Sequence, residues 1–65
     1  MKNLYRADDE LYKKWAKEFI DKYPKETDQL AHNAWWFRKK AYEDGYEIRY
    51  DDADFDFWDY VCDLQ

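Results

Sequence analysis

Hydrophobic residues recur at intervals of three and four along the first third of the chain, which is the period of an amphipathic helix. Asp8 or Asp9 can cap the start of this helix, and carboxylates in its first turn suit the positive end of the helix dipole. Pro24 ends the helix, because the residue before a proline avoids the helical region. The pattern predicts a helix over about 8–23, with an apolar stripe of Leu11, Tyr12, Trp15, Ala16, Phe19, Ile20 and Tyr23.

A second hydrophobic stripe predicts a helix over about 28–44. Thr27 is its natural N-cap, and the single glycine, Gly45, stands where a helix end favours a left-handed residue. Arg38 falls within the stripe and is expected to reach solvent or to pair with an acid. Trp36 points away from the stripe, so it is expected either to be exposed or to pack against a neighbouring segment. The expected apolar face consists of Leu30, Ala31, Ala34, Trp35, Phe37, Ala41 and Tyr42.

The last third of the chain contains one extended segment and one segment of ambiguous type. Residues 46–50 alternate in polarity, and because an isolated strand cannot form a sheet we interpret them as a connector that packs as a loop. A hairpin with residues 2–6 is the alternative. Residues 54–57 also alternate, yet a helical reading places Phe57, Val61 and Leu64 on one side. We therefore predict a third helix over about 52–64.

These elements predict an all-α protein, a small three-helix bundle formed by one domain over residues 1–65. The first two helices are expected to be antiparallel across a short turn, with the third packed over both. A domain of 65 residues buries only about 60% of its unfolded surface, so its stability is marginal. Cys62 has no partner for a disulfide, which leaves large core residues or oligomerisation as the sources of added stability.

Charge is divided unequally along the chain. Residues 1–42 contain ten Lys and Arg against seven Asp and Glu, a net of +3, whereas residues 43–65 contain one against nine, a net of −8. Such asymmetry indicates an interaction surface. The alternative is that the acidic part packs against the basic part of the same molecule.

Four aspartates of the third predicted helix follow one another at spacings of four, three and four residues, which places them within about 60° of each other on the helix. A surface of this kind repels nucleic acids and attracts the Lys- and Arg-lined grooves that bind them. The alternative is an ordinary solvated helix face. Aromatic residues, 23% of the chain, supply candidate anchors for a partner. The candidate partner-binding residues are Asp52, Asp56, Asp59, Asp63, Trp36, Tyr46, Tyr50 and Tyr60.

Groups for catalysis or metal binding are scarce. The chain has no serine, one histidine and one cysteine, and a dyad of His32 and Cys62 would set the thiol among aspartates that oppose its ionisation. Asp52, Asp54 and Asp56 match the start of a calcium-binding loop, but Phe57 stands where that loop needs glycine. We therefore expect no enzymatic activity, no cofactor and no metal. A lone cysteine and the lack of a long apolar run favour a cytoplasmic protein.

In length, acidity and aromatic content the chain resembles the small acidic proteins that phages use against host machinery, such as anti-restriction DNA mimics and anti-CRISPR proteins. This resemblance implies an inhibitor or adaptor that occludes a basic surface of a nucleic-acid-binding protein, for example a host nuclease or defence complex. A second resemblance, to short helical domains of the YozE type, is carried with gaps by Trp15, Leu30-Ala31, Ala41-Tyr42-Glu43-Asp44 and Trp58-Asp59.

Two further functions compete with this prediction. The protein would act as a self-associating structural or regulatory module if the acidic face of one copy paired with the basic face of another in a homodimer. It would bind nucleic acid directly if the lysines of the first two helices formed a basic patch, although the acidic tail opposes phosphate binding. The lysines concerned are Lys13, Lys14, Lys17, Lys39 and Lys40.

Overall fold

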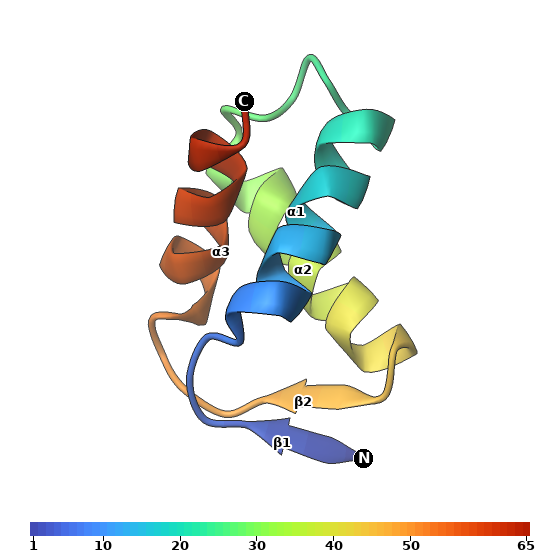
Figure 1. The fold of residues 1–65 in the computed structure, drawn as a ribbon, viewed down its shortest axis with the longest axis vertical. Coiled ribbons are helices and arrows are strands. Elements are labelled where there is room, and N and C mark those ends of the chain that lie inside the picture. The colour runs from blue at the N-terminus through green and yellow to red at the C-terminus, as the bar shows by residue number, and fades with distance from the viewer.

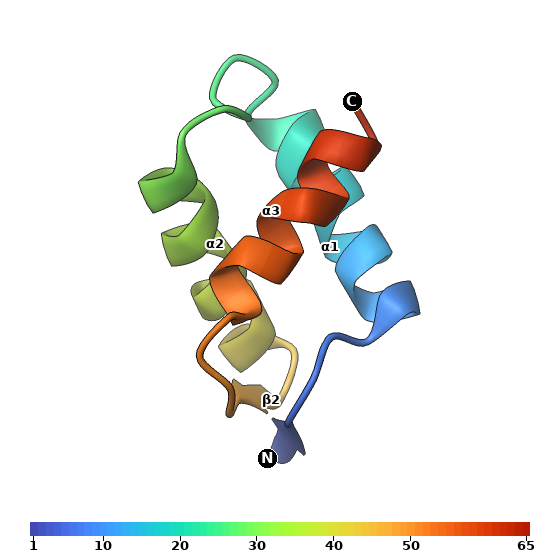
Figure 2. The same cartoon turned by 90° about the vertical axis from the view of Figure 1, so that its left-hand side faces the viewer.

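The computed structural model describes all residues from Met1 to Gln65. It contains three helices, α1 (Asp9–Lys22), α2 (Leu30–Glu43) and α3 (Ala53–Asp63), and two short strands, β1 (Lys2–Leu4) and β2 (Tyr46–Ile48). In Figure 1 α1 rises and α2 descends while both run from left to right, so the two helices cross at a steep angle instead of forming the expected antiparallel pair, and α3 crosses both (Figures 1 and 2). The prediction of three helices is confirmed, and each helix begins and ends within two residues of its predicted bounds. The protein is mostly helical with a minor sheet, rather than all-α.

The start and end of α1 follow from local sequence. Asp8 is the N-cap, and its Oδ1 accepts a hydrogen bond of 3.2 Å from the backbone N–H of Leu11. Tyr23, directly before Pro24, leaves the helical region with φ −131° and ψ 59°. The helix therefore ends where the proline was expected to end it.

The N-cap of α2 is not the residue that was predicted, whereas Gly45, which follows the end of the helix, has the predicted left-handed conformation. Gln29, and not Thr27, is the N-cap, and its side chain makes no capping hydrogen bond. Thr27 is instead buried, and its carbonyl oxygen lies 3.4 Å from Nδ2 of the buried Asn33. At the other end Gly45 has φ +89°, a conformation that L side chains rarely adopt.

The connector at residues 46–50 includes a strand, so its interpretation as a loop is wrong. β1 and β2 pair in parallel, with Leu4 opposite Ile48. The Lys2 N–H donates to the Gly45 oxygen at 2.9 Å, and the Arg49 N–H donates to the Leu4 oxygen at 2.8 Å. The alternative pairing with residues 2–6 is therefore correct in its partner, but it is not a hairpin. The sheet lies at one end of the molecule, below the helices in Figure 1.

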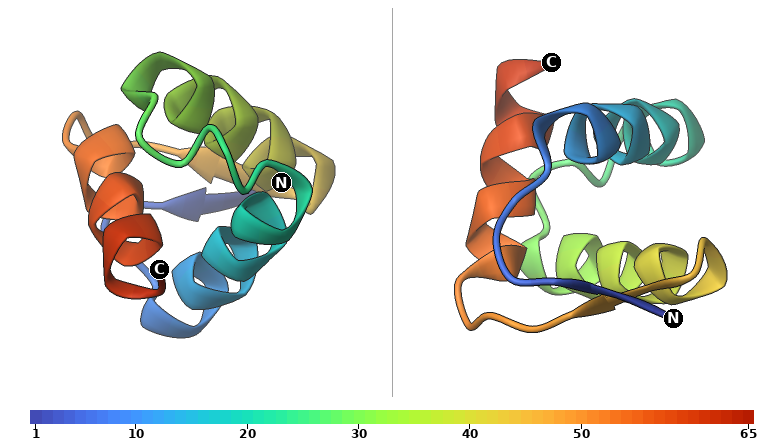
Figure 3. Two further views of the ribbon diagram at one scale, coloured as in Figure 1. Left: turned by 90° about the horizontal axis from the view of Figure 1, so that it is seen from above. Right: turned by 60° about the horizontal axis from the view of Figure 1, so that its bottom comes forward.

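The core is dominated by aromatic rings from all three helices, and Phe57 of α3 lies at its centre. Its ring centroid is 4.6 Å from that of Phe37, 6.1 Å from Trp36, 6.2 Å from Tyr12 and 6.4 Å from Phe19. Viewed along the long axis, the three helices surround this centre (Figure 3). The buried hydrophobic residues are Leu4, Tyr12, Trp15, Ala16, Phe19, Trp36, Phe37, Ala41, Ala53, Phe57 and Val61.

The inward face of α2 is rotated relative to the predicted stripe. Trp36 is only 6% exposed, and its ring packs against that of Phe19 at 5.4 Å. Trp35 and Tyr42 were expected to be inside, yet they are 57% and 68% exposed. The reason is tertiary: Phe57 of α3 stacks on Trp36, so that side of α2 turns toward the core.

Candidate functional site

Three of the four aspartates of the predicted face, Asp56, Asp59 and Asp63, lie on α3, and Asp52 is the N-cap residue directly before it. Asp52, Asp59 and Asp63 are exposed, and Asp56 is half-buried. They share a side of the helix that differs from the buried side formed by Ala53, Phe57 and Val61. With a rise of about 1.5 Å per residue, successive members are about 4.5–6 Å apart along the helix axis. We call Asp52, Asp56, Asp59 and Asp63 the acidic row.

None of the four carboxylates of the acidic row takes part in an ion pair. Other acids of the C-terminal part are neutralised within the molecule. Asp54 accepts a hydrogen bond of 2.9 Å from Arg38 Nε, and Asp44 lies 3.5 Å from Lys40 Nζ. The internal pairing of acidic and basic parts therefore occurs, but it leaves the acidic row uncompensated.

One edge of the acidic row adjoins the first turn of α1. The Tyr60 hydroxyl donates a hydrogen bond of 2.8 Å to Asp9 Oδ1, and Lys13 Nζ lies 3.1 Å from Asp9 Oδ2. The hydrogen bond from Tyr60, aided by Lys13, lowers the pKa of Asp9, and the same hydrogen bond raises the pKa of Tyr60 to about 12. A hollow of about 430 Å³ lies here, lined by Asp9, Lys13, Asp59, Tyr60, Asp63 and Leu64.

The half-burial of Asp56 is explained by the tyrosines beside it. The Tyr12 and Tyr50 hydroxyls lie 2.8 Å apart and share a hydrogen bond. Burial raises the pKa of both phenols, and the nearby Asp56 carboxylate raises them further. Asp56 thus touches the interior of the protein, whereas the other members of the acidic row face solvent.

The aromatic residues predicted as anchors are mostly occupied inside the molecule. Trp36 is buried, which corrects its assignment as an exposed anchor. Tyr46 is half-buried, with its ring 5.7 Å from that of Trp15, and Tyr50 and Tyr60 are half-buried with their hydroxyls bonded to other side chains. These three tyrosines can offer a partner only part of each ring.

Sequence reasoning missed the aromatic residues that are exposed. Trp35 and Tyr42 lie on the outer side of α2, and Phe55 lies on α3 with 60% of its surface exposed. One signal was present in the sequence: Arg38 fell in the middle of the predicted apolar stripe, and a charge in that position indicates that the stripe has been drawn at the wrong rotation. Arg38 in fact lies outside the core and pairs with Asp54.

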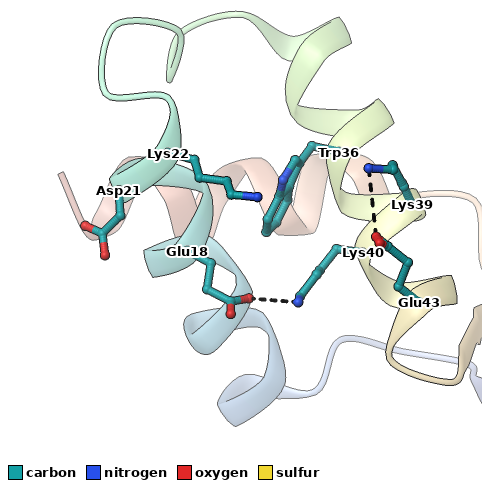
Figure 4. A pocket seen from close by; sticks show the side chains of 7 residues that line it. All are labelled: Glu18, Asp21, Lys22, Trp36, Lys39, Lys40 and Glu43. Carbon is teal, nitrogen blue, oxygen red and sulfur yellow. Dashed lines mark ion pairs between the residues drawn. The ribbon is translucent and has the colours of Figure 1, made fainter.

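A second hollow, of about 360 Å³, lies between the C-terminal half of α1 and α2, and the buried Trp36 forms part of its wall (Figure 4). Glu18 lies 3.6 Å from Lys40 across this hollow, and Lys39 lies 3.9 Å from Glu43 on α2. Three cations and three acids line it, so their charges balance. The lining residues are Glu18, Asp21, Lys22, Trp36, Lys39, Lys40 and Glu43.

The residues considered for catalysis and metal binding do not assemble into a site. No group of three His, Cys, Asp or Glu side chains is arranged to hold a metal ion. His32 Nδ1 lies 2.9 Å from Glu26 Oε2, and Cys62 is exposed on α3. The aspartates that resembled a calcium-binding loop belong to the start of α3, where Asp54 pairs with Arg38 instead.

Comparisons with known proteins give no relative from which a function can be transferred. None of the helices has the length and apolar character needed to cross a membrane. No family model, no curated protein and no solved structure matches the chain.

Proposed function

We propose that this protein binds a basic, nucleic-acid-handling surface of another protein through the acidic row and blocks that surface without turnover. The observation that carries the proposal is the absence of any ion pair to Asp52, Asp56, Asp59 or Asp63. A partner groove lined by Lys and Arg would supply the missing cations, and a host nuclease or defence complex is a partner of this kind.

The charge around the acidic row supports association with a cationic partner. Residues 50–65 contain six aspartates and neither Lys nor Arg. Only Asp54 of these six is paired, with Arg38. A field of one sign raises the rate at which an oppositely charged partner is encountered, and the effect declines as salt screens the charges.

The basic half of the chain is less available for direct binding of nucleic acid. Lys13 pairs with Asp9, Lys39 with Glu43, and Lys40 with both Glu18 and Asp44. Of the six cations in residues 1–42 that form no ion pair, only Lys14 and Lys17 belong to the predicted basic patch, and the others are Lys2, Arg6, Lys22 and Lys25. Two lysines in the patch neutralise few phosphates, and phosphate contacts supply most of the non-specific affinity for nucleic acids. Partner binding through the acidic row is therefore the better-supported function.

Charge reversal at the exposed end of the acidic row tests the proposal. Asp59→Lys combined with Asp63→Lys changes the net charge from −5 to −1. Immobilised wild-type protein should retain nucleic-acid-binding proteins from a cell lysate, and excess double-stranded DNA should release them. The double variant should retain at least about tenfold less of these proteins, which corresponds to a loss of about 1.4 kcal/mol in binding free energy.

The matched control reverses two exposed acids outside the acidic row, Asp21→Lys and Asp28→Lys, neither of which forms an ion pair. It reaches the same net charge of −1 and should retain partners as the wild type does. Equal loss in both variants would indicate an unspecific effect of net charge. Undiminished capture by the Asp59 and Asp63 variant would refute the proposed site.

A further inference from the structure

The hollow between α1 and α2 contains polar groups that form no hydrogen bond within the protein. The Glu18 Oε2 atom is buried and accepts none, because Lys40 Nζ, the cation it faces, lies 3.6 Å away. Lys22 forms no ion pair, and no side-chain hydrogen bond uses the indole N–H of Trp36. One acceptor and two donors therefore line the same hollow without hydrogen-bond partners.

Glu18 and Lys22 stay apart although their positions favour a contact. They stand four residues apart on α1 with the acid first, which is the spacing and order that favour an ion pair on a helix. In the structure Glu18 is turned toward Lys40 of α2, whereas Lys22 extends toward Trp36 (Figure 4). The two opposite charges thus remain separated by one turn, about 6 Å along the axis, on one wall of the hollow. A ligand that carries both charges can contact both of them.

The rest of the lining favours a small ligand without net charge. Three cations and three acids line the hollow, so an anion would be repelled by Glu18 and Glu43, and a cation by Lys39 and Lys40. The volume of about 360 Å³ lies near the lower end of the range for small-molecule sites, about 300–1,000 Å³. Trp36 is fixed by the core and supplies a rigid apolar part of the wall.

We infer that this hollow binds a free amino acid with an apolar side chain. The ammonium group of the ligand donates to Glu18 Oε2, and its carboxylate accepts from Lys22 and from the indole N–H of Trp36. The side chain of the ligand packs against the Trp36 ring. None of the acidic row lines the hollow, so this inference does not depend on the function proposed for that row. A ligand of about 12 non-hydrogen atoms should bind with a dissociation constant on the order of 1 mM.

L-phenylalanine is the probe for this site, and two analogues that each lack one of its charges are the matched comparisons. The ammonium group is absent from 3-phenylpropionate, and the carboxylate is absent from phenethylamine. When the full chain is titrated and the NMR signal of the Trp36 indole N–H is followed, L-phenylalanine should saturate the signal, and each analogue should bind at least about tenfold more weakly. An analogue that binds as tightly as L-phenylalanine would overturn the inference, as would an unchanged signal at about 20 mM L-phenylalanine.

Lys22→Gln tests the same site by changing the protein. Lys22 is exposed and unpaired, so the variant should keep the circular dichroism spectrum and thermal midpoint of the wild type. It should nevertheless bind L-phenylalanine at least about tenfold more weakly, because the carboxylate loses its cation.

Lys17→Gln is the matched control, because Lys17 is also an exposed, unpaired lysine of α1 but does not line the hollow. Both variants have a net charge of −6. The Lys17 variant should bind L-phenylalanine as the wild type does. Unchanged binding by the Lys22 variant, or equal weakening in the two variants, would show that the ligand does not occupy this hollow.

Discussion

Phe57 of α3 stacks on Phe37 of α2 with ring centroids 4.6 Å apart and ring planes 13° from parallel. Phe57 also meets Tyr12 of α1 edge to face at 6.2 Å. One side chain thus joins the third helix to both members of the α1–α2 pair. In a chain of 65 residues no second core can compensate for its loss.

Truncation of Phe57 should therefore remove a large part of the stability of the protein. Phe57→Ala is expected to cost about 3–5 kcal/mol, against a total stability of about 3–10 kcal/mol for a domain of this size. Chemical denaturation followed by circular dichroism measures the loss. Phe55→Ala, two residues away but 60% exposed, should change the free energy of unfolding by less than about 0.5 kcal/mol. Similar losses in the two variants would show that Phe57 does not hold this central position.

The parts of the fold that sequence predicts are those with a local cause. Asp8 caps α1, Pro24 follows its end, and Gly45 follows α2 with a positive φ, all of which depend on a residue and its nearest neighbours. The pairing of β1 with β2 has no local cause. Leu4 and Ile48 become neighbours only after α1 and α2 have folded back on each other, so neither segment signals the other in the sequence.

The candidate site divides in the same way. The acidic row was predictable, because aspartates at helical spacing share a side of α3 wherever that helix packs. The anchors were not, because Trp35 and Trp36 are equally hydrophobic neighbours about 100° apart, and only contacts with other helices decide which is buried. α2 also places the polar Asn33 in the core while Trp35 faces solvent, which inverts the pattern that sequence reasoning uses.

Trp15 and Asp44 make the second contact whose loss should be measurable. Trp15 is fully buried, and its Nε1 donates a hydrogen bond of 2.8 Å to Asp44 Oδ2. Asp44→Ala leaves the indole N–H without a partner inside the protein and should cost about 1–3 kcal/mol. Asp44→Asn keeps an oxygen acceptor and should cost about 1 kcal/mol or less. Denaturant midpoints of the two variants compare these costs, and an equal loss would mean that the charge, and not the acceptor, matters.

The hydrogen bond between Tyr60 and Asp9 should make stability depend on pH in the acid range. It lowers the folded-state pKa of Asp9 below its unfolded value of about 4, so its contribution is present above pH 4 and is lost as the pH falls through the folded-state pKa. Tyr60→Phe should therefore lower the thermal midpoint at pH 7, and the difference from the wild type should shrink toward pH 2–3.

The variant Asp9→Asn provides the control for this pH dependence. In a protein that carries Asp9→Asn, the Tyr60→Phe substitution should change the thermal midpoint by the same amount at pH 7 and at pH 3, because the titrating carboxyl has been removed.

At the alkaline end the sign is opposite: the same contact raises the pKa of Tyr60 to about 12, so its contribution to stability is lost as the pH rises from about 10 through 12. A wild-type advantage that is constant from pH 3 to 7 would contradict the assignment.

The acidic row should reduce the stability of the protein that carries it. Its members repel one another at spacings of three and four residues, and Asp63 lies at the negative end of the dipole of α3. Asp59→Lys with Asp63→Lys should therefore raise the free energy of unfolding by about 0.5–1.5 kcal/mol. Sodium chloride screens the repulsion, so the wild type should become more stable between 10 and 500 mM salt, and the double variant should respond less. A wild-type stability that fell with salt would mean that cations of the same molecule neutralise these carboxylates. The acidic row would then not be free to bind the cations of a partner.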